Sequence, residues 1–337
     1  MVAIVSGNSL GLGLGLNPAS TPASTSASSG TSGASAPGAW VNVATGNLTL
    51  QVQDDYLAAR GDDAAALRTY NSQGLFDDDN ADNWSTGFYT QALRLSGTLN
   101  ADGSTLERTS RDGAVDSFVY NAMRSMYVGA SGANVADTVT QVVGMQLEWR
   151  DGATGATQRY AVLDEMRLAS SADASGNRTL YAYDALGQIA RVTTASGEST
   201  FYNYQGRNLI QLRVEAQGAA PAVRTRYAYD ASNRLARVVV DLTPQDSSVA
   251  DGKVFETVYT YDGASLRVAS LTQSDGVAMR ITYVQVGGQS RVASVTDALG
   301  QGTRFSYGAG LATVTDPLGI VTRYELDPQG RVTAIVV

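Results

Sequence analysis

The sequence contains neither cysteine nor histidine. Without cysteine there can be no disulfide, no thiolate metal site and no cysteine nucleophile. Without histidine, the usual general base, the serine-histidine triad and the commonest metal ligand are lost together. We therefore assign no catalytic residue and no metal ligand, and we expect neither an enzyme nor a bound cofactor.

Long apolar runs and an excess of positive charge are missing as well. No stretch approaches the roughly 20 apolar residues that a membrane helix needs, and the start, Met1 to Leu16, lacks the basic residues of a signal peptide. The formal net charge of -8 would repel phosphate backbones. We expect a soluble chain with no membrane span and no affinity for nucleic acid.

The composition divides the chain into three parts. Asn17 to Gly38 is almost wholly Ala, Ser, Thr, Gly and Pro, so residues 1–39 are predicted to be a flexible N-terminal segment. Residues 40–150 alternate apolar and polar positions between Asp-Gly turns, a pattern that predicts strands. Only Asp63 to Arg68 suggests a helix, and it is too short to be stable alone. Residues 151–337 are the third part, a repeat region.

The repeat region reuses one motif, an aspartate followed three residues later by glycine or asparagine. A type I turn that ends in a residue at positive φ favours Asp first, tolerates Pro second and needs Gly or Asn fourth. Pro317, Pro328 and Asn233 are exchanges that such a turn allows. The motif therefore predicts structural turns, whose first and fourth residues are Asp173 and Gly176, Asp184 and Gly187, Asp230 and Asn233, Asp297 and Gly300, Asp316 and Gly319, and Asp327 and Gly330.

Between these turns lie strands of about six to eight residues, which is the rhythm of an antiparallel meander. Tyrosines occupy alternate positions in several of them, including the pairs Tyr181 and Tyr183, and Tyr227 and Tyr229. Alternate residues of a strand face the same side. We favour packing of these rings between strands. A ladder of exposed tyrosines that binds sugar is the alternative.

The unit NRTLYAYDALGQIARV, echoed by RTRYAYDASNRLARV, resembles the tyrosine-aspartate (YD) repeats of Rhs proteins of the bacterial polymorphic-toxin type. Further upstream, VNVATGNLTLQVQDDYL, LRTYNSQG and NWSTGFYTQALRL resemble, in order, the region that precedes those repeats. The resemblance implies an all-β fold of antiparallel β-hairpin repeats (a meander) that spiral into a curved sheet or partial shell. In that family the shell encloses a C-terminal toxic domain.

Two acidic groups invite other interpretations. The run Asp77 to Asp82 offers oxygen ligands for calcium, but Asn83 stands where an EF-hand loop needs glycine and Tyr89 where it needs glutamate. A solvated acidic loop is favoured, and calcium binding of another kind is the alternative. Asp164 and Glu165 are adjacent, so on a strand they would face opposite sides and could not work as a general acid and base.

These observations predict a non-enzymatic repeat protein, part of an Rhs-type β-shell that encapsulates, scaffolds or delivers a C-terminal toxin. The partners implied are a downstream toxin domain or other copies of the shell, and secretion machinery. Such a protein would be secreted or delivered from a bacterium and would be cytoplasmic before export. The alternative is an extracellular adhesion or carbohydrate-binding module, and a hydrolase built on aspartates alone is the least favoured reading.

Overall fold

The computed structural model describes residues 3–5, 38–57, 64–74, 80–86, 92–109, 115–130 and 135–337, except residues 217, 219, 247 and 329. Residues 17–37 of the linker, Asp77 to Asp79 and Tyr89 lie outside these ranges. The described residues form strands and one short 3-10 turn, η2 (Pro244–Asp246), and contain no α-helix. No described helix is long and apolar enough to cross a membrane. The prediction of an all-β fold is confirmed.

Five strands form a small sheet near the N-terminus. β1 pairs in parallel with β2, whereas the other neighbours are antiparallel. The stretch that suggested a helix lies largely in β4, so that suggestion is wrong: pairing along the whole length of β3 overrides the local propensity of three alanines. In order the strands are β1 (Ala3–Val5), β2 (Gly38–Asn42), β3 (Leu48–Leu57), β4 (Ala64–Asn71) and β5 (Trp84–Thr86).

The remaining 22 strands form one long antiparallel meander in which each strand pairs with the next. Its first part comprises β6 (Leu93–Ser96), β7 (Thr105–Thr109), β8 (Val115–Asn121), β9 (Met126–Gly129), β10 (Thr138–Val142), β11 (Gln146–Arg150), β12 (Thr157–Ala161) and β13 (Arg167–Ala172). Its second part comprises β14 (Arg178–Tyr183), β15 (Ile189–Thr193), β16 (Ser199–Gln205), β17 (Asn208–Glu215), β18 (Ala222–Tyr229), β19 (Leu235–Asp241), β20 (Val254–Tyr261), β21 (Val268–Gln273), β22 (Ala278–Val286), β23 (Gln289–Asp297), β24 (Gly302–Gly308), β25 (Leu311–Thr315), β26 (Val321–Leu326) and β27 (Val332–Val336).

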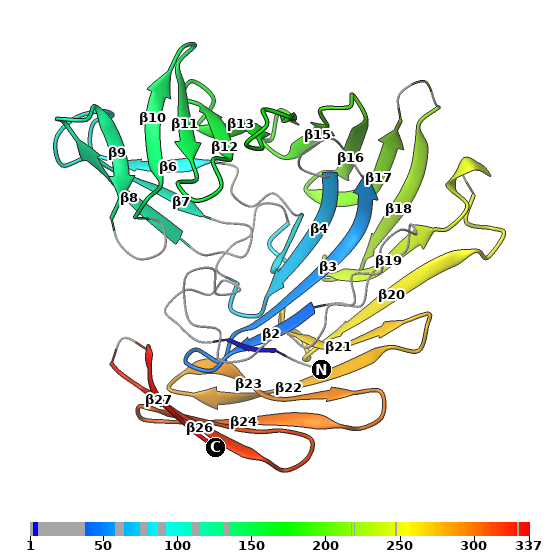
Figure 1. Ribbon diagram of the computed structural model, residues 1–337. Coiled ribbons are helices and arrows are strands. Elements are labelled where there is room, and N and C mark those ends of the chain that lie inside the picture. The colour runs from blue at the N-terminus through cyan, green and yellow to red at the C-terminus, as the bar shows by residue number, and fades with distance from the viewer. Residues whose placement is uncertain are drawn as a thin grey trace.

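The meander is strongly curved (Figure 1). Its first part, β6–β13, curls until Ala92 forms a bridge with Arg167 at the start of β13, and it surrounds a core that includes Leu106, Phe118 and Tyr160. Its second part, β14–β27, sweeps around the small sheet, which lies on its concave side (Figure 1). One apolar core joins the two sheets, because Leu50 and Tyr70 of the small sheet and Leu212 and Leu271 of the meander belong to it.

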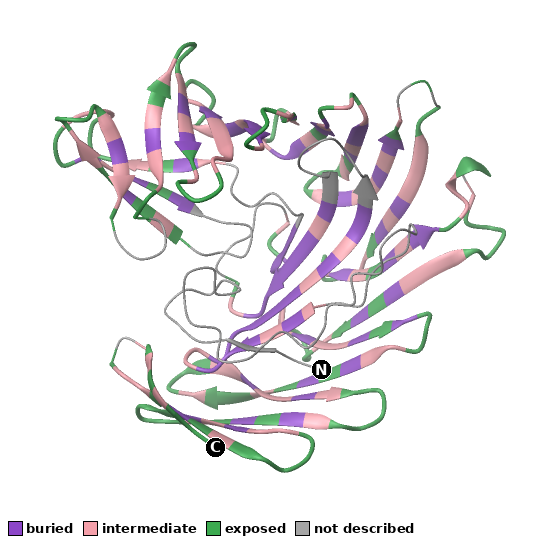
Figure 2. Ribbon diagram, viewed as in Figure 1, coloured by how far each residue is buried: buried purple, intermediate pink, exposed green. Residues whose placement is uncertain are grey.

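Alternation along each strand explains why the meander has one buried and one exposed face. In β24, for example, Thr303 and Phe305 point toward the small sheet and are buried, whereas Arg304 and Ser306 point outward and are exposed. The same alternation runs through the other strands (Figure 2). We call the face of β14–β27 that is turned away from the small sheet the outer face. The period of two that predicted strands thus also decides which side chains meet solvent.

Candidate functional site

The aspartates of the repeated turn motif face the backbone of their own turns. In all six turns the carbonyl of the aspartate accepts the N–H of the fourth residue, at 2.9–3.1 Å. The carboxylate adds further bonds: Asp184 Oδ1 accepts the N–H groups of Leu186 at 2.8 Å and Gln188 at 2.9 Å. The fourth residues have positive φ, including 78° at Gly187 and 62° at Asn233.

The same arrangement recurs at the other turns. Each remaining aspartate accepts one or two backbone N–H groups through its Oδ1 atom, from Ser175 and Asn177, Ser232 and Arg234, Leu299 and Gln301, Leu318 and Ile320, and Arg331. The remaining fourth residues have φ values of 84° at Gly176, 78° at Gly300, 85° at Gly319 and 76° at Gly330. The motif residues thus lie at separate hairpin tips, and the fold does not gather them into one site.

Tyrosines at or near the ends of five strands join neighbouring hairpins. The phenol of Tyr229 in β18 donates to the carbonyl of Leu209 in β17, at 3.0 Å. Equivalent bonds of 2.7–2.9 Å run from Tyr183 to Leu168, Tyr261 to Leu235, Tyr283 to Val268 and Tyr307 to Val292. Each acceptor lies at or near the start of the preceding strand. We call this set of five bonds the tyrosine ladder.

An arginine beside the acceptor often completes a rung of the ladder. Arg234 precedes Leu235, and its guanidinium carbon lies 4.5 Å from the centre of the Tyr261 ring. Arg291 precedes Val292 and stacks 5.2 Å from Tyr307. Arg167 and Arg267 stand in the same way over Tyr183 and Tyr283. Such cation–π contacts add to the hydrogen bond, so these four ladder tyrosines are each held by the preceding hairpin in two ways.

Burial keeps four of the five ladder phenols protonated. It raises the pKa of Tyr183, Tyr261, Tyr283 and Tyr307 above the ordinary value of 10.0 because a phenolate would lose its hydration. These side chains therefore remain hydrogen-bond donors at all ordinary pH values. A β-bulge also lies directly before Tyr183, Tyr229, Tyr261 and Tyr283, and such bulges re-aim the side chains that follow.

A buried ion pair lies where the small sheet meets the meander. Arg68 of β4 donates to both carboxylate oxygens of Asp54 in β3, at 2.8 and 2.9 Å, and both side chains are 3% exposed. Tyr227 donates to Asp54 at 2.8 Å, and Arg68 donates to the Tyr259 phenol at 3.0 Å. The guanidinium also lies 4.5 Å from the Trp84 ring. Burial opposes the charge of Arg68, yet Asp54 raises its pKa well above the ordinary value.

Two further carboxylates cross the same interface. Asp82 accepts the N–H of Leu235 in β19 at 2.9 Å and that of Trp84 at 3.0 Å. It is 2% exposed, so the expectation of a solvated acidic loop is wrong for this residue. Asp55 pairs at 3.1 Å with Arg224, which falls within a register shift of β18. The sequence analysis singled out neither Asp54, Asp55 nor Arg68, although Arg68 belongs to the quoted LRTYNSQG segment.

The adjacent carboxylates Asp164 and Glu165 lie in the turn between β12 and β13. Both contact the guanidinium of Arg167, Asp164 at 2.8 Å. The expectation that the two would face opposite sides of a strand is therefore wrong, because Glu165 has a positive φ of 49° and the chain turns there. Their common partner gives them a structural role in this turn.

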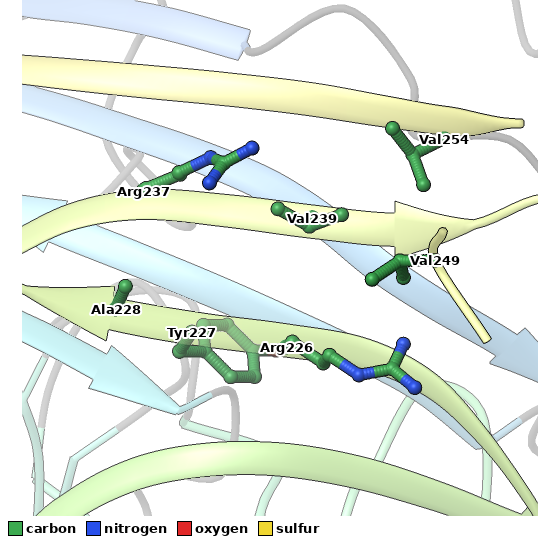
Figure 3. Close-up of a pocket in the computed structure, with 7 residues that line it drawn as sticks. All are labelled: Arg226, Tyr227, Ala228, Arg237, Val239, Val249 and Val254. Atoms are coloured by element: carbon green, nitrogen blue, oxygen red, sulfur yellow. The ribbon is translucent and has the colours of Figure 1, made fainter. Parts of the chain in front are cut away.

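A pocket of about 220 Å³ opens on the outer face over β18–β20 (Figure 3). Val239, Val249 and Val254 line it between Arg226 and Arg237. Each arginine has an acidic partner: Arg237 pairs with Glu256 at 2.5 Å, and Arg226 lies 3.5 Å from Asp241. The pocket is smaller than the roughly 300–1,000 Å³ of typical ligand sites. The described residues also hold no group of three side chains suited to a metal ion.

Comparison with known proteins gives one family and several distant structures. The family model described as RHS Repeat matches residues 167–199 and 308–337. Among solved structures, TcdB2-TccC3-Cdc42 is 10% identical over 85% of this chain, with a TM-score of 0.31. The Tc holotoxin pore of Photorhabdus luminescens with mutated TccC3 is 12% identical over 86%, with the same TM-score. Such scores do not establish a shared arrangement of strands.

This chain spans about a fifth of the length of those chains, 21% and 20% respectively. No curated protein matches it. The two family matches cover β13–β15 and β25–β27, together with four of the six turn motifs. The interpretation of these two segments as YD units is therefore confirmed, and the chain contains RHS repeats at both places.

Proposed function

We propose that this chain is a wall segment of an Rhs-type shell that encapsulates, scaffolds or delivers a C-terminal toxin. The observation that carries the proposal is the continuous curved sheet β14–β27, in which the tyrosine ladder ties hairpin to hairpin. A wall needs this property, since a sheet whose strands are all bonded to neighbours leaves no gap through which a protease or cargo could pass.

The turn motif then has a structural role only. Its aspartates and glycines shape hairpin tips, and the proposed mechanism is steric: a wall separates a toxic domain from the cell that makes it. The partners would be the toxin domain or other copies of the wall, and delivery from a bacterium would follow. On this proposal the chain carries no catalytic group, in keeping with the structural role of RHS repeats.

Limited proteolysis of the complete reading frame that contains this chain tests the proposal. We expect the segment that follows the wall to be cut more slowly than when it is produced alone. Leu235→Asp should abolish this protection, because Leu235 is 1% exposed in the core between the two sheets and a buried carboxylate would disrupt that core. Leu299→Asp is the matched control, since Leu299 is 83% exposed at a hairpin tip.

Equal cleavage of the following segment with and without the wall would contradict encapsulation.

The adhesion alternative has less support, because a sugar platform needs exposed rings. Tyr202, Tyr227, Tyr259 and Tyr324 are instead 3–7% exposed, and the ladder phenols are occupied within the chain. Carbohydrate binding through these tyrosines would require the sheet to open.

A further inference from the structure

The outer face of the last strands carries arginines that the wall does not use. Arg280 in β22, Arg304 in β24 and Arg323 in β26 are exposed, whereas their neighbours along each strand are buried or partly buried. No salt bridge or hydrogen bond joins these three guanidinium groups to any described residue. This differs from the pocket over β18–β20, where both arginines have acidic partners. We call the three residues the arginine row.

The pairing register places the row on a regular diagonal. Arg280 lies opposite Thr296 of β23, and Arg304 lies opposite Ser294 of the same strand. Arg304 and Arg323 show the same two-residue offset on β25, where they lie opposite Thr315 and Thr313. Two strand spacings and two residues along a strand give about 12 Å between successive Cα atoms. The positive charges thus repeat at even intervals across the sheet.

Hydroxyl groups fill the positions between the arginines. Arg280 is flanked across the strands by Ser270 and Thr296, and Arg304 by Ser294 and Thr315. Thr282 and Ser294 share a hydrogen bond of 2.7 Å on the same face. Within described β22–β26, Glu325 is the one carboxylate at an outward position, and it forms no ion pair with Arg323. The surface therefore combines spaced cations with hydroxyl donors and acceptors.

We propose that the arginine row binds an anionic polysaccharide, a chain whose carboxylate or sulfate groups recur along a hydroxyl-rich backbone. Arginine offers paired N–H donors to such oxyanions, and the serine and threonine hydroxyls match the neutral hydroxyls of the sugars. Cationic charge in this protein is almost entirely arginine, since Lys253 is its one lysine. The regular spacing of these outward side chains suits an extended polymer.

Other polyanions fit this surface less well. A peptide would need an open strand edge or an apolar groove, but β22–β26 are each paired on both sides. Single-stranded nucleic acid is usually held by aromatic stacking as well as charge, and the described outward positions of β22–β26 hold no aromatic ring. The chain's net charge of -8 adds a general repulsion.

The test titrates the full chain with polygalacturonate, with heparin and with neutral dextran at low salt, and measures affinity by calorimetry. We expect binding to one or both anionic polymers, none to dextran, and weakening as salt is added. The triple variant Arg280→Gln, Arg304→Gln and Arg323→Gln should bind about tenfold more weakly or worse. Polygalacturonate and heparin distinguish carboxylate from sulfate as the preferred group.

A matched control removes the same charge elsewhere. Arg94, Arg124 and Arg150 are exposed in the first part of the meander, and their triple change to Gln should leave affinity almost unchanged. Equal weakening in both triple variants would reduce the effect to general charge and overturn the proposal. It would also fall if the wild-type chain bound neither polymer, or if polyglutamate bound more tightly through the same arginines. The outcome of this test does not depend on whether the chain acts as a shell wall.

Discussion

At the scale of single residues, the first and fourth positions of the repeated turn have different roles: the first acts through its side chain and the fourth through its backbone conformation. The aspartate serves as an acceptor for N–H groups, whereas the fourth residue must hold a positive φ. Asn233 adopts that φ without being glycine, as asparagine does more readily than other residues with a Cβ atom. The two positions should therefore respond differently to substitution.

Gly187→Val should lower the free energy of unfolding by about 2 kcal/mol, because a β-branched residue is strained at positive φ. A Cβ atom there would also lie 2.6 Å from the Arg167 guanidinium. Gly187→Asn is the control and should cost clearly less, as the natural Asn233 indicates. Urea unfolding of the wild-type chain and the two variants measures both effects. A valine variant as stable as the wild type would show that positive φ causes no strain at this position.

Asp173 should titrate below its ordinary pKa of 3.8. A hydrogen bond from the Asn177 side chain lowers this pKa most, and the backbone N–H groups of Asn177 and Ser175 lower it further. Because the pKa is lower in the folded chain, the stabilisation is complete above the ordinary pKa and is lost as the pH falls through the lowered value. Carboxyl NMR titration should show a rise in the Asp173 pKa in Asn177→Ala, and an unchanged value would refute the assignment.

At the scale of elements, the tyrosine ladder predicts how much one phenol hydroxyl contributes to the free energy of unfolding. Tyr307→Phe removes the bond of 2.8 Å to the Val292 carbonyl and should cost about 1 kcal/mol of unfolding free energy. Tyr324→Phe is the matched control: its ring is also buried, but the structure shows no hydrogen bond from its phenol, so it should cost little. Thermal unfolding compares the two, and equal losses would show that the ladder bond adds nothing.

The strands and turns were the part of the fold that could best be predicted from the sequence, because both depend on residues close together along the chain. The period of two and the Asp-x-x-Gly spacing predicted the meander. Local patterns failed for β4, where pairing with β3 outweighed alanine's helical preference. They also gave no hint that β1 pairs in parallel with β2, since that pairing joins segments separated by the whole linker.

At the scale of the whole molecule, a few buried polar bonds hold the small sheet against the meander. Arg68, Asp54 and Asp82 all reach side chains or backbone of β18–β20. These contacts join residues more than 150 positions apart, so no local pattern could reveal them. From the sequence alone a single arginine is expected to lie at the surface, and only the folded structure shows that Arg68 is buried.

Arg68→Met should therefore lower the free energy of unfolding by about 3–5 kcal/mol, because it leaves the Asp54 carboxylate buried without its charge partner. Adding Asp54→Leu should recover part of that loss. Arg237→Met is the control, since its pair with Glu256 is half exposed on the outer face and should be worth at most about 1 kcal/mol. Hydrogen exchange in β3 and β4 would locate the effect, and unchanged protection there would contradict it.

The tyrosine ladder also bears on how the sheet would yield to mechanical force. Each rung fastens a hairpin to the one before it, and the ladder's last rung is Tyr307, since Leu326, which lacks a hydroxyl, follows the corresponding bulge in β26. Tension applied from the C-terminal end would first peel the unfastened β26 and β27, then break one rung for every hairpin released. The protein would lengthen in discrete steps, one repeat at a time.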